Sequence, residues 1–94
     1  MNKYEMVVIL DAQKTQEEKD AIAKQAVDAV QKNDGKVINS AVWLEKQKLS
    51  FRIKRCGEGT YYLINFEGQG ETAAKVRQLL KINEEILRTA IFRV

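Results

Sequence analysis

Four cationic side chains occupy alternate positions in one stretch of the chain, a spacing that could bind an anion. Residues 46–55 include five basic residues and no acid. The alternating ones are Lys46, Lys48, Arg52 and Lys54. In a strand, alternate side chains point to the same face, so these four would form one positive row. Because like charges in such a row repel one another, the pattern favours binding of a polyanion opposite them.

Side chains suited to catalysis or metal binding are scarce. The chain has no histidine and one cysteine, which excludes the usual zinc ligand sets. Cys56 follows Arg55 but has no partner base, so we interpret it as a free thiol rather than a nucleophile. The adjacent acids Glu84 and Glu85 precede a predicted strand, where such pairs are usually solvated. We therefore expect no enzymatic activity, no cofactor and no metal site.

Length and composition predict a single domain spanning residues 1–94. No apolar run approaches the roughly 20 residues that cross a bilayer, and the single cysteine suits a reducing, cytoplasmic setting. The net charge of +3 is unevenly spread, because residues 1–43 hold more acids than bases and all five arginines lie beyond them. That asymmetry is compatible with a nucleic-acid partner and equally with a plain solvated basic surface.

The hydrophobic pattern predicts six elements in the order β-α-β-β-α-β. Strands are expected at 3–10, 36–53, 60–67 and 86–93, and helices from 15 to about 33 and at 71–81. Thr15 stands three residues before Glu18, the spacing of a capping box. Gly35 is expected to end the first helix with a positive φ, and residues 56–59 are expected to form a turn.

The faces of two strands carry further expectations. In the long strand, Trp43 shares its parity with the predicted core positions, so we interpret it as a packing residue. Glu45 and Gln47 interrupt that apolar row, which indicates a bend or bulge. In the following strand, Tyr61 and Leu63 lie opposite the core face and predict an apolar patch covered by another protein, with base stacking by Tyr61 as the alternative.

Two split β-α-β units with right-handed crossovers give an α+β, ferredoxin-like fold. It would be a four-stranded antiparallel sheet of strand order 4-1-3-2, with two helices on one face and the other face open. The basic strand 36–53 would then lie at an edge. An exposed edge either accepts a partner or uses its lysines only to prevent aggregation, and the pattern alone leaves both possibilities open.

Short segments along nearly the whole chain resemble the bacterial small-subunit ribosomal protein S6 family. They are Tyr4-Glu5, Leu49-Ser-Phe-Arg-Ile53 followed by Lys54, Gly59 with the aromatic strand to Phe66-Glu67, Ile82-Asn83, Ile86, Arg88 and the apolar final segment that ends at Arg93. The chain departs from the family at Arg52, where proline is usual, and at Glu45, where glycine is frequent.

The resemblance implies a structural ribosomal protein that is monomeric when isolated. It would bind the central domain of small-subunit rRNA as a heterodimer with small-subunit ribosomal protein S18. The residues expected on the RNA side are Lys3, Tyr4, Lys54, Arg55, Arg88 and Arg93. Those expected to serve the partner protein or the RNA are Lys46, Lys48, Phe51, Arg52, Tyr61 and Leu63. The alternative function is a ferredoxin-like regulatory or effector-binding module that homodimerises through its edge strand.

Overall fold

The computed structural model describes residues 2–53 and 56–94, and within these it describes every side chain except those of Lys46, residues 50–53 and Cys56. The elements are β1 (Asn2–Asp11), α1 (Gln16–Lys32), β2 (Lys36–Ile53), β3 (Cys56–Gly68), α2 (Gly70–Lys81) and β4 (Ile86–Arg93). Their order is the predicted β-α-β-β-α-β.

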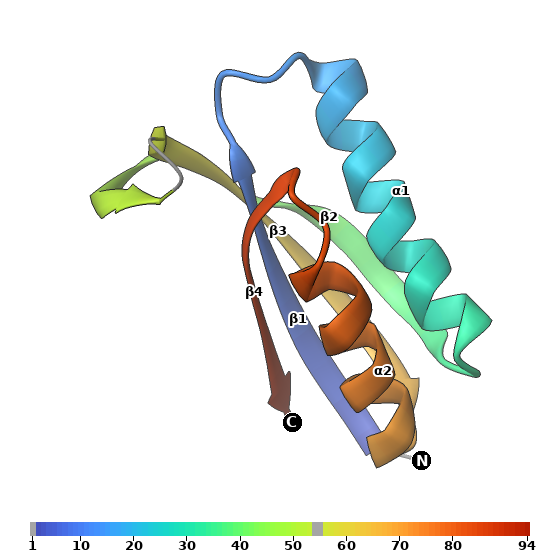
Figure 1. The fold of residues 1–94 in the computed structure, drawn as a ribbon. Coiled ribbons are helices and arrows are strands. Elements are labelled where there is room, and N and C mark those ends of the chain that lie inside the picture. Colours follow the sequence, from blue (N-terminus) through green and yellow to red (C-terminus); the bar gives the residue numbers. More distant parts are fainter. Residues whose placement is uncertain (1, 54–55) are drawn as a thin grey trace.

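The strands form one antiparallel sheet in the order β2-β3-β1-β4. This is the 4-1-3-2 order, and both helices lie on the same side of the sheet (Figure 1). The predicted ferredoxin-like fold is therefore confirmed, as is the edge position of the basic strand. The sheet consequently has a helix-covered face and an open face.

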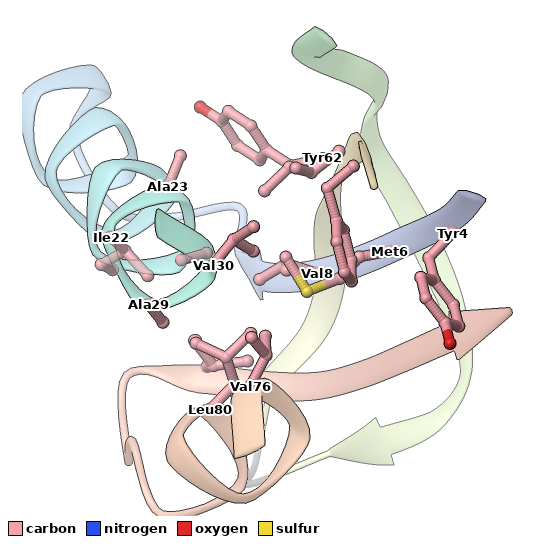
Figure 2. Packing of buried hydrophobic residues seen from close by; sticks show 14 of the residues in the cluster. Tyr4, Met6, Val8, Ile22, Ala23, Ala29, Val30, Tyr62, Val76 and Leu80 are labelled. Atoms are coloured by element: carbon pink, nitrogen blue, oxygen red, sulfur yellow. The ribbon is translucent and has the colours of Figure 1, made fainter. Parts of the chain in front are cut away.

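The core lies between the helices and the sheet, where alternate residues of the two central strands meet the apolar sides of α1 and α2 (Figure 2). The largest fully buried side chains are Phe66, Met6, Leu10, Ile22, Ile64, Val8, Val30, Val76 and Thr60. Burial of each large apolar side chain contributes roughly 1.5–3 kcal/mol, so this layer fixes the register of β1 and β3. The intervening residues of both strands must then point to the open face.

The first helix begins with the predicted capping box. The Thr15 hydroxyl accepts a hydrogen bond from the Glu18 backbone N–H at 3.2 Å, and the Thr15 backbone N–H donates to the Glu18 carboxylate at 3.3 Å. These two bonds satisfy donors that a helix start otherwise leaves unpaired. The bond from the Thr15 backbone N–H, with the Thr15 side chain next, lowers the pKa of Glu18 from its ordinary value.

The end of that helix differs from the prediction. Asp34 carries the positive φ of 64°, and none of the described glycines has a positive φ. Gly35 is required by close approach instead, because a Cβ there would lie 2.5 Å from Val30 Cγ1 and 2.9 Å from the Val30 carbonyl oxygen. The Gly35 backbone N–H donates to that same oxygen at 2.9 Å.

The predicted turn at 56–59 is wrong, because β3 already begins at Cys56 and pairs with β2 from Ile53 onward. Gly59 lies inside the strand, where a Cβ would approach Ile9 Cγ2 to 2.7 Å. That glycine reflects crowding on the sheet face rather than a chain reversal. Residues 54 and 55 lie outside the described part of the chain.

The interruption expected at Glu45 and Gln47 is confirmed by a register shift between Leu44 and Gln47. Further shifts follow Val37 and Val42, so β2 is irregular along much of its length. The β2–β3 hairpin extends past the ends of the other strands (Figure 1). Bulges of this kind bend and twist an edge strand, which re-aims the side chains beside them.

Candidate protein and nucleic-acid interface

The open face of the sheet carries two neighbouring apolar rows. Residues paired directly across antiparallel strands point to the same face, with Cβ atoms about 4.5–5.5 Å apart. Reading from β2 to β4, the rows are Ala41–Leu63–Val7–Ala90 and Leu44–Tyr61–Ile9–Arg88. We call the seven apolar members of these rows the open-face stripe. The stripe crosses all four strands, and no helix covers it (Figure 1).

The stripe has its own small packed centre, separate from the helix-side core. Ile9 is 8% exposed and Leu49 is 9% exposed, and neither belongs to the core cluster beneath the helices. A Cβ at Gly59 would meet both Ile9 Cγ2 and Leu49 Cδ2, at 2.7 and 3.4 Å. Leu49 therefore reaches from the hairpin onto the stripe. Leu49 shares the parity of the predicted core row, but it is buried on the open face instead of in the helix-side core. The side chains of Phe51 and Ile53 lie outside the described part of the chain.

Trp43 corrects the interpretation from parity. It lies at the register shift between Val42 and Leu44, is 53% exposed, and its ring meets that of Tyr61 edge to face. The parity is reversed by the earlier shift between Val37 and Asn39, because Val37 pairs with the core residue Phe66 whereas Ala41 pairs with Leu63 on the open face. Glu45 has the same parity as Trp43, and a charged residue in the row predicted to face the core indicated that Trp43 is not buried there. Trp43 thus extends the open-face stripe toward the hairpin.

Two cations flank the stripe on neighbouring strands. Arg88 ends one of its rows, directly opposite Ile9, and Lys3 lies opposite Glu67 near the other end of β1. Both side chains are exposed. Six residues of β1 separate their rows, which corresponds to about 20 Å. The structure therefore places these two predicted RNA-binding residues on the same face but does not bring them together.

Tyr4 and Arg93 lie on the other side of the sheet. Tyr4 pairs with Phe66 and with Arg93 across the strands. Its ring stacks on that of Phe66 with 5.2 Å between the centroids, and the residue is only 8% exposed. Its hydroxyl accepts a hydrogen bond from Asn2 Nδ2 at 3.3 Å. The RNA contact of Tyr4 stays a prediction, and only the exposed margin of the ring could make it. Arg93 is exposed at the end of β4. It lies close to Lys3, because the backbone N–H of the following residue, Val94, donates a hydrogen bond to the Lys3 carbonyl oxygen at 2.9 Å.

The hairpin residues are described only in part. Lys48 is exposed, and Glu58 lies opposite it on β3. The side chains of Lys46, Phe51 and Arg52, and Lys54 and Arg55 entirely, lie outside the described part of the chain. The predicted positive row is therefore represented in the structure by Lys48, and the predictions for the other members stand as made.

The described ranges, 2–53 and 56–94, contain no group of three histidine, cysteine or acidic residues that could hold a metal ion. The helices among them are too short or too polar to cross a membrane. The most distinctive surface of the described residues is thus the open-face stripe with the cations on either side of it.

Comparison with known sequences points to one family. A family model described as ribosomal protein S6 matches residues 3–93. The small ribosomal subunit protein bS6 of Symbiobacterium thermophilum is 34% identical over 93 residues, which cover 99% of this chain and 97% of that one. The bS6 protein of Corynebacterium jeikeium is 30% identical over the same shares of the two chains.

Comparison with solved structures supports the fold. The 30S ribosomal protein S6 of Thermotoga maritima superimposes with a TM-score of 0.88 at 22% identity, covering 99% of this chain and 87% of that one. The C-terminal domain of the MgtC protein of Mycobacterium tuberculosis also superimposes, with a TM-score of 0.64 at 8% identity, covering 100% of this chain and 88% of that one. A similar fold therefore occurs in proteins of different description.

Proposed function

The chain belongs to the ribosomal protein S6 family of the small ribosomal subunit, and from that membership we propose that it binds the central domain of small-subunit rRNA as a heterodimer with ribosomal protein S18. The proposed role is structural rather than catalytic. The protein would position rRNA and partner without carrying out a reaction.

The open-face stripe is the observation that carries the partner half of the proposal. It offers an apolar surface across four strands, with Trp43 and Tyr61 in ring contact at its hairpin end. Aromatic residues are enriched at the centres of protein interfaces, where they supply most of the binding energy. A ribosomal partner that covered the stripe would remove these rings from water. The edge of β2 beside it presents further unpaired backbone groups.

The cations support the RNA half of the proposal. Arg88 and Lys3 point to the open face on either side of the stripe, so a protein seated on the stripe would leave them at its margins. Phosphate contacts position a protein on RNA, while arginine can also contact base edges. We propose Lys3, Arg88 and Arg93, together with Lys54 and Arg55 of the hairpin, as the phosphate contacts. Lys48 of the exposed edge would serve the partner or the RNA.

A homodimeric regulatory module remains the second candidate, since the exposed β2 edge could pair with a second copy of this chain. Light scattering of the isolated chain separates the two functions. The ribosomal role predicts a monomer, and the second candidate predicts a dimer that forms with rising concentration.

The direct test is co-sedimentation. Small subunits lacking the endogenous S6 protein should retain the purified chain through a moderate-salt wash when S18 is present. A chain that washes off under these conditions, while a known S6 protein is retained, would contradict the proposed function.

A further inference from the structure

A cavity of about 390 Å³ lies between α2 and β4, away from the centre of the open-face stripe. Its lining residues are Arg77, Leu80, Lys81, Ile86, Leu87, Arg88 and Thr89. The first three come from the second half of α2, and the last four form the start of β4. Pockets of roughly 300–1,000 Å³ are the size that holds a small-molecule ligand or one nucleotide.

The charge of this cavity is one-sided. Three of the lining residues are cationic and none is acidic. A second cavity of about 320 Å³, between α1 and α2, shares the Leu80 wall but has Asp28 as well as Lys32 in its lining. The two cavities have similar size and similar apolar walls, so the excess of positive charge distinguishes the first. An anionic group is the ligand that this charge would attract.

A polar group at the first cavity also lacks a partner. The Thr89 hydroxyl oxygen is buried and makes no hydrogen bond within the described part of the chain. A buried hydroxyl without a partner is unfavourable, so a ligand oxygen that reached it would gain a bond the free protein does not make. Arg77 is held nearby, because its Nη2 lies 3.5 Å from the Ile91 carbonyl oxygen on the free edge of β4.

We propose that this cavity binds one unstacked nucleotide of a single-stranded RNA segment. Its phosphate would lie among Arg77, Lys81 and Arg88, with the Thr89 hydroxyl donating to it. Its base would pack against Leu87 and Leu80. RNA recognition commonly uses splayed bases of single-stranded segments in this way. The inference deepens the proposed function and rests on it for the source of the RNA.

Arg88 connects the cavity with the rest of the proposed RNA surface. It lines the cavity and also ends a row of the open face, opposite Ile9. A strand that followed the margin of the open face could therefore continue into the cavity. The bound nucleotide would extend the RNA contact from the sheet to the side of α2.

The probe for a first test is hexa-adenylate RNA, with inorganic phosphate at equal concentration as the comparison. Amide NMR of the whole chain should show saturable shifts at Leu87, Arg88 and Thr89 with the RNA and much smaller shifts with phosphate. Shifts confined to other surfaces, or equal binding of phosphate, would overturn the proposal. Because this readout needs neither S18 nor the ribosome, its failure is distinguishable from loss of small-subunit co-sedimentation.

Charge variants sharpen the test. The double substitution Arg77→Gln with Lys81→Gln should weaken hexa-adenylate binding at least fivefold and flatten the log–log salt slope by about 0.7, the value for one single-strand phosphate. Lys24→Gln with Lys32→Gln removes the same charge from exposed positions on α1 and is the matched control. Equal losses in both double variants would show only a net-charge effect and would overturn the site.

The Thr89 hydroxyl gives a second, neutral test. Thr89→Val removes the unpaired hydroxyl, so it should raise the melting temperature of the free protein while weakening hexa-adenylate binding. Thr60→Val is the control, since Thr60 has a buried, unpaired hydroxyl of the same description but lies in the helix-side core. Thr60→Val should raise the melting temperature without changing RNA affinity. If Thr89→Val also leaves the affinity for hexa-adenylate unchanged, the proposed hydrogen bond from the Thr89 hydroxyl to the phosphate is overturned.

Discussion

The rings of Trp43 and Tyr61 meet edge to face, with 6.2 Å between their centroids and 73° between their planes. Tyr61 is on β3, and Trp43 lies at a register shift of β2, so the contact joins the edge strand to its neighbour. Trp43 nevertheless remains half exposed. An aromatic pair that is already in contact and still open to solvent loses little conformational entropy on binding, which suits it to a protein interface.

Replacing Trp43 by alanine should affect partner binding far more than folding. We expect S18 affinity to fall by about 2 kcal/mol or more, the range of an interface hot spot. The coupling of Trp43 and Tyr61 in a double-mutant cycle of unfolding should be about 0.5–1.5 kcal/mol. Isothermal titration and denaturant unfolding measure the two effects. Ile82→Ala, which shortens a 77% exposed side chain beyond α2, is the control and should leave S18 affinity unchanged.

The salt dependence of RNA binding should report the cations of the open face. If about four phosphates are neutralised, the log–log slope for the heterodimer on single-stranded rRNA should be near −3. Lys3→Gln with Arg88→Gln should flatten it by about 1.4. Replacing Lys46, Lys48, Arg52 and Lys54 by alanine tests the hairpin row separately. Filter binding at salt concentrations from about 50 to about 300 mM gives the slopes. An unchanged slope would remove the substituted residues from the RNA contact.

The end of α1 allows a test of whether Asp34 or Gly35 has the positive φ at which glycine is favoured. Gly35→Ala should destabilise the protein by about 1–3 kcal/mol, because its Cβ would collide with Val30. Asp34→Gly should stabilise it by up to about 1 kcal/mol, since Asp34 holds the positive φ. Denaturant midpoints measure both. The opposite ordering would mean that the helix ends as the sequence alone suggests.

The pH dependence of stability should contain a contribution from Glu18. Its pKa is lowered in the folded protein, first by the hydrogen bond from the Thr15 backbone N–H. The ionised carboxylate therefore stabilises the fold above the ordinary pKa, and this contribution is lost as the pH falls through the lowered folded value. Thermal melts between neutral and acid pH should show a loss that Glu18→Gln removes.

A matched control for this effect lies in the same turn of α1. Glu17→Gln removes the same charge beside the capping box without altering either of its two bonds. If both variants flatten the pH profile equally, the helix dipole rather than the capping box is the source of the dependence.

The order of the elements was predictable because the hydrophobic periodicity and the positions of the capping and turn residues agree along most of the chain. Residues 86–93 were expected as a strand and form β4, and Thr15 with Glu18 marked the start of α1. Alternation also placed Tyr61 and Leu63 on the open face, as their pairing with Ile9 and Val7 confirms. In these places the local sequence pattern and the burial of one face specify the same secondary structure and the same side-chain direction.

Parity failed where the strand is irregular. The shift between Val37 and Asn39 had already turned Ala41, and Trp43 after it, to the open face, and the hydrophobicity of a tryptophan does not tell which face it occupies. The cavity between α2 and β4 was unpredictable for another reason. Arg77 and Arg88 are eleven positions apart on different elements, and only the packing of α2 beside β4 brings them to one site.

The central position of β1 has a consequence for how this chain is made. β1 is hydrogen-bonded to β3 on one side and to β4 on the other, and the Val94 N–H donates to the Lys3 carbonyl at 2.9 Å. Within this domain, β1 is synthesised before β4, so its second edge is uncovered until β4 has also been made. Until then the nascent polypeptide exposes an apolar strand, so its folding is completed only after translation of the whole domain.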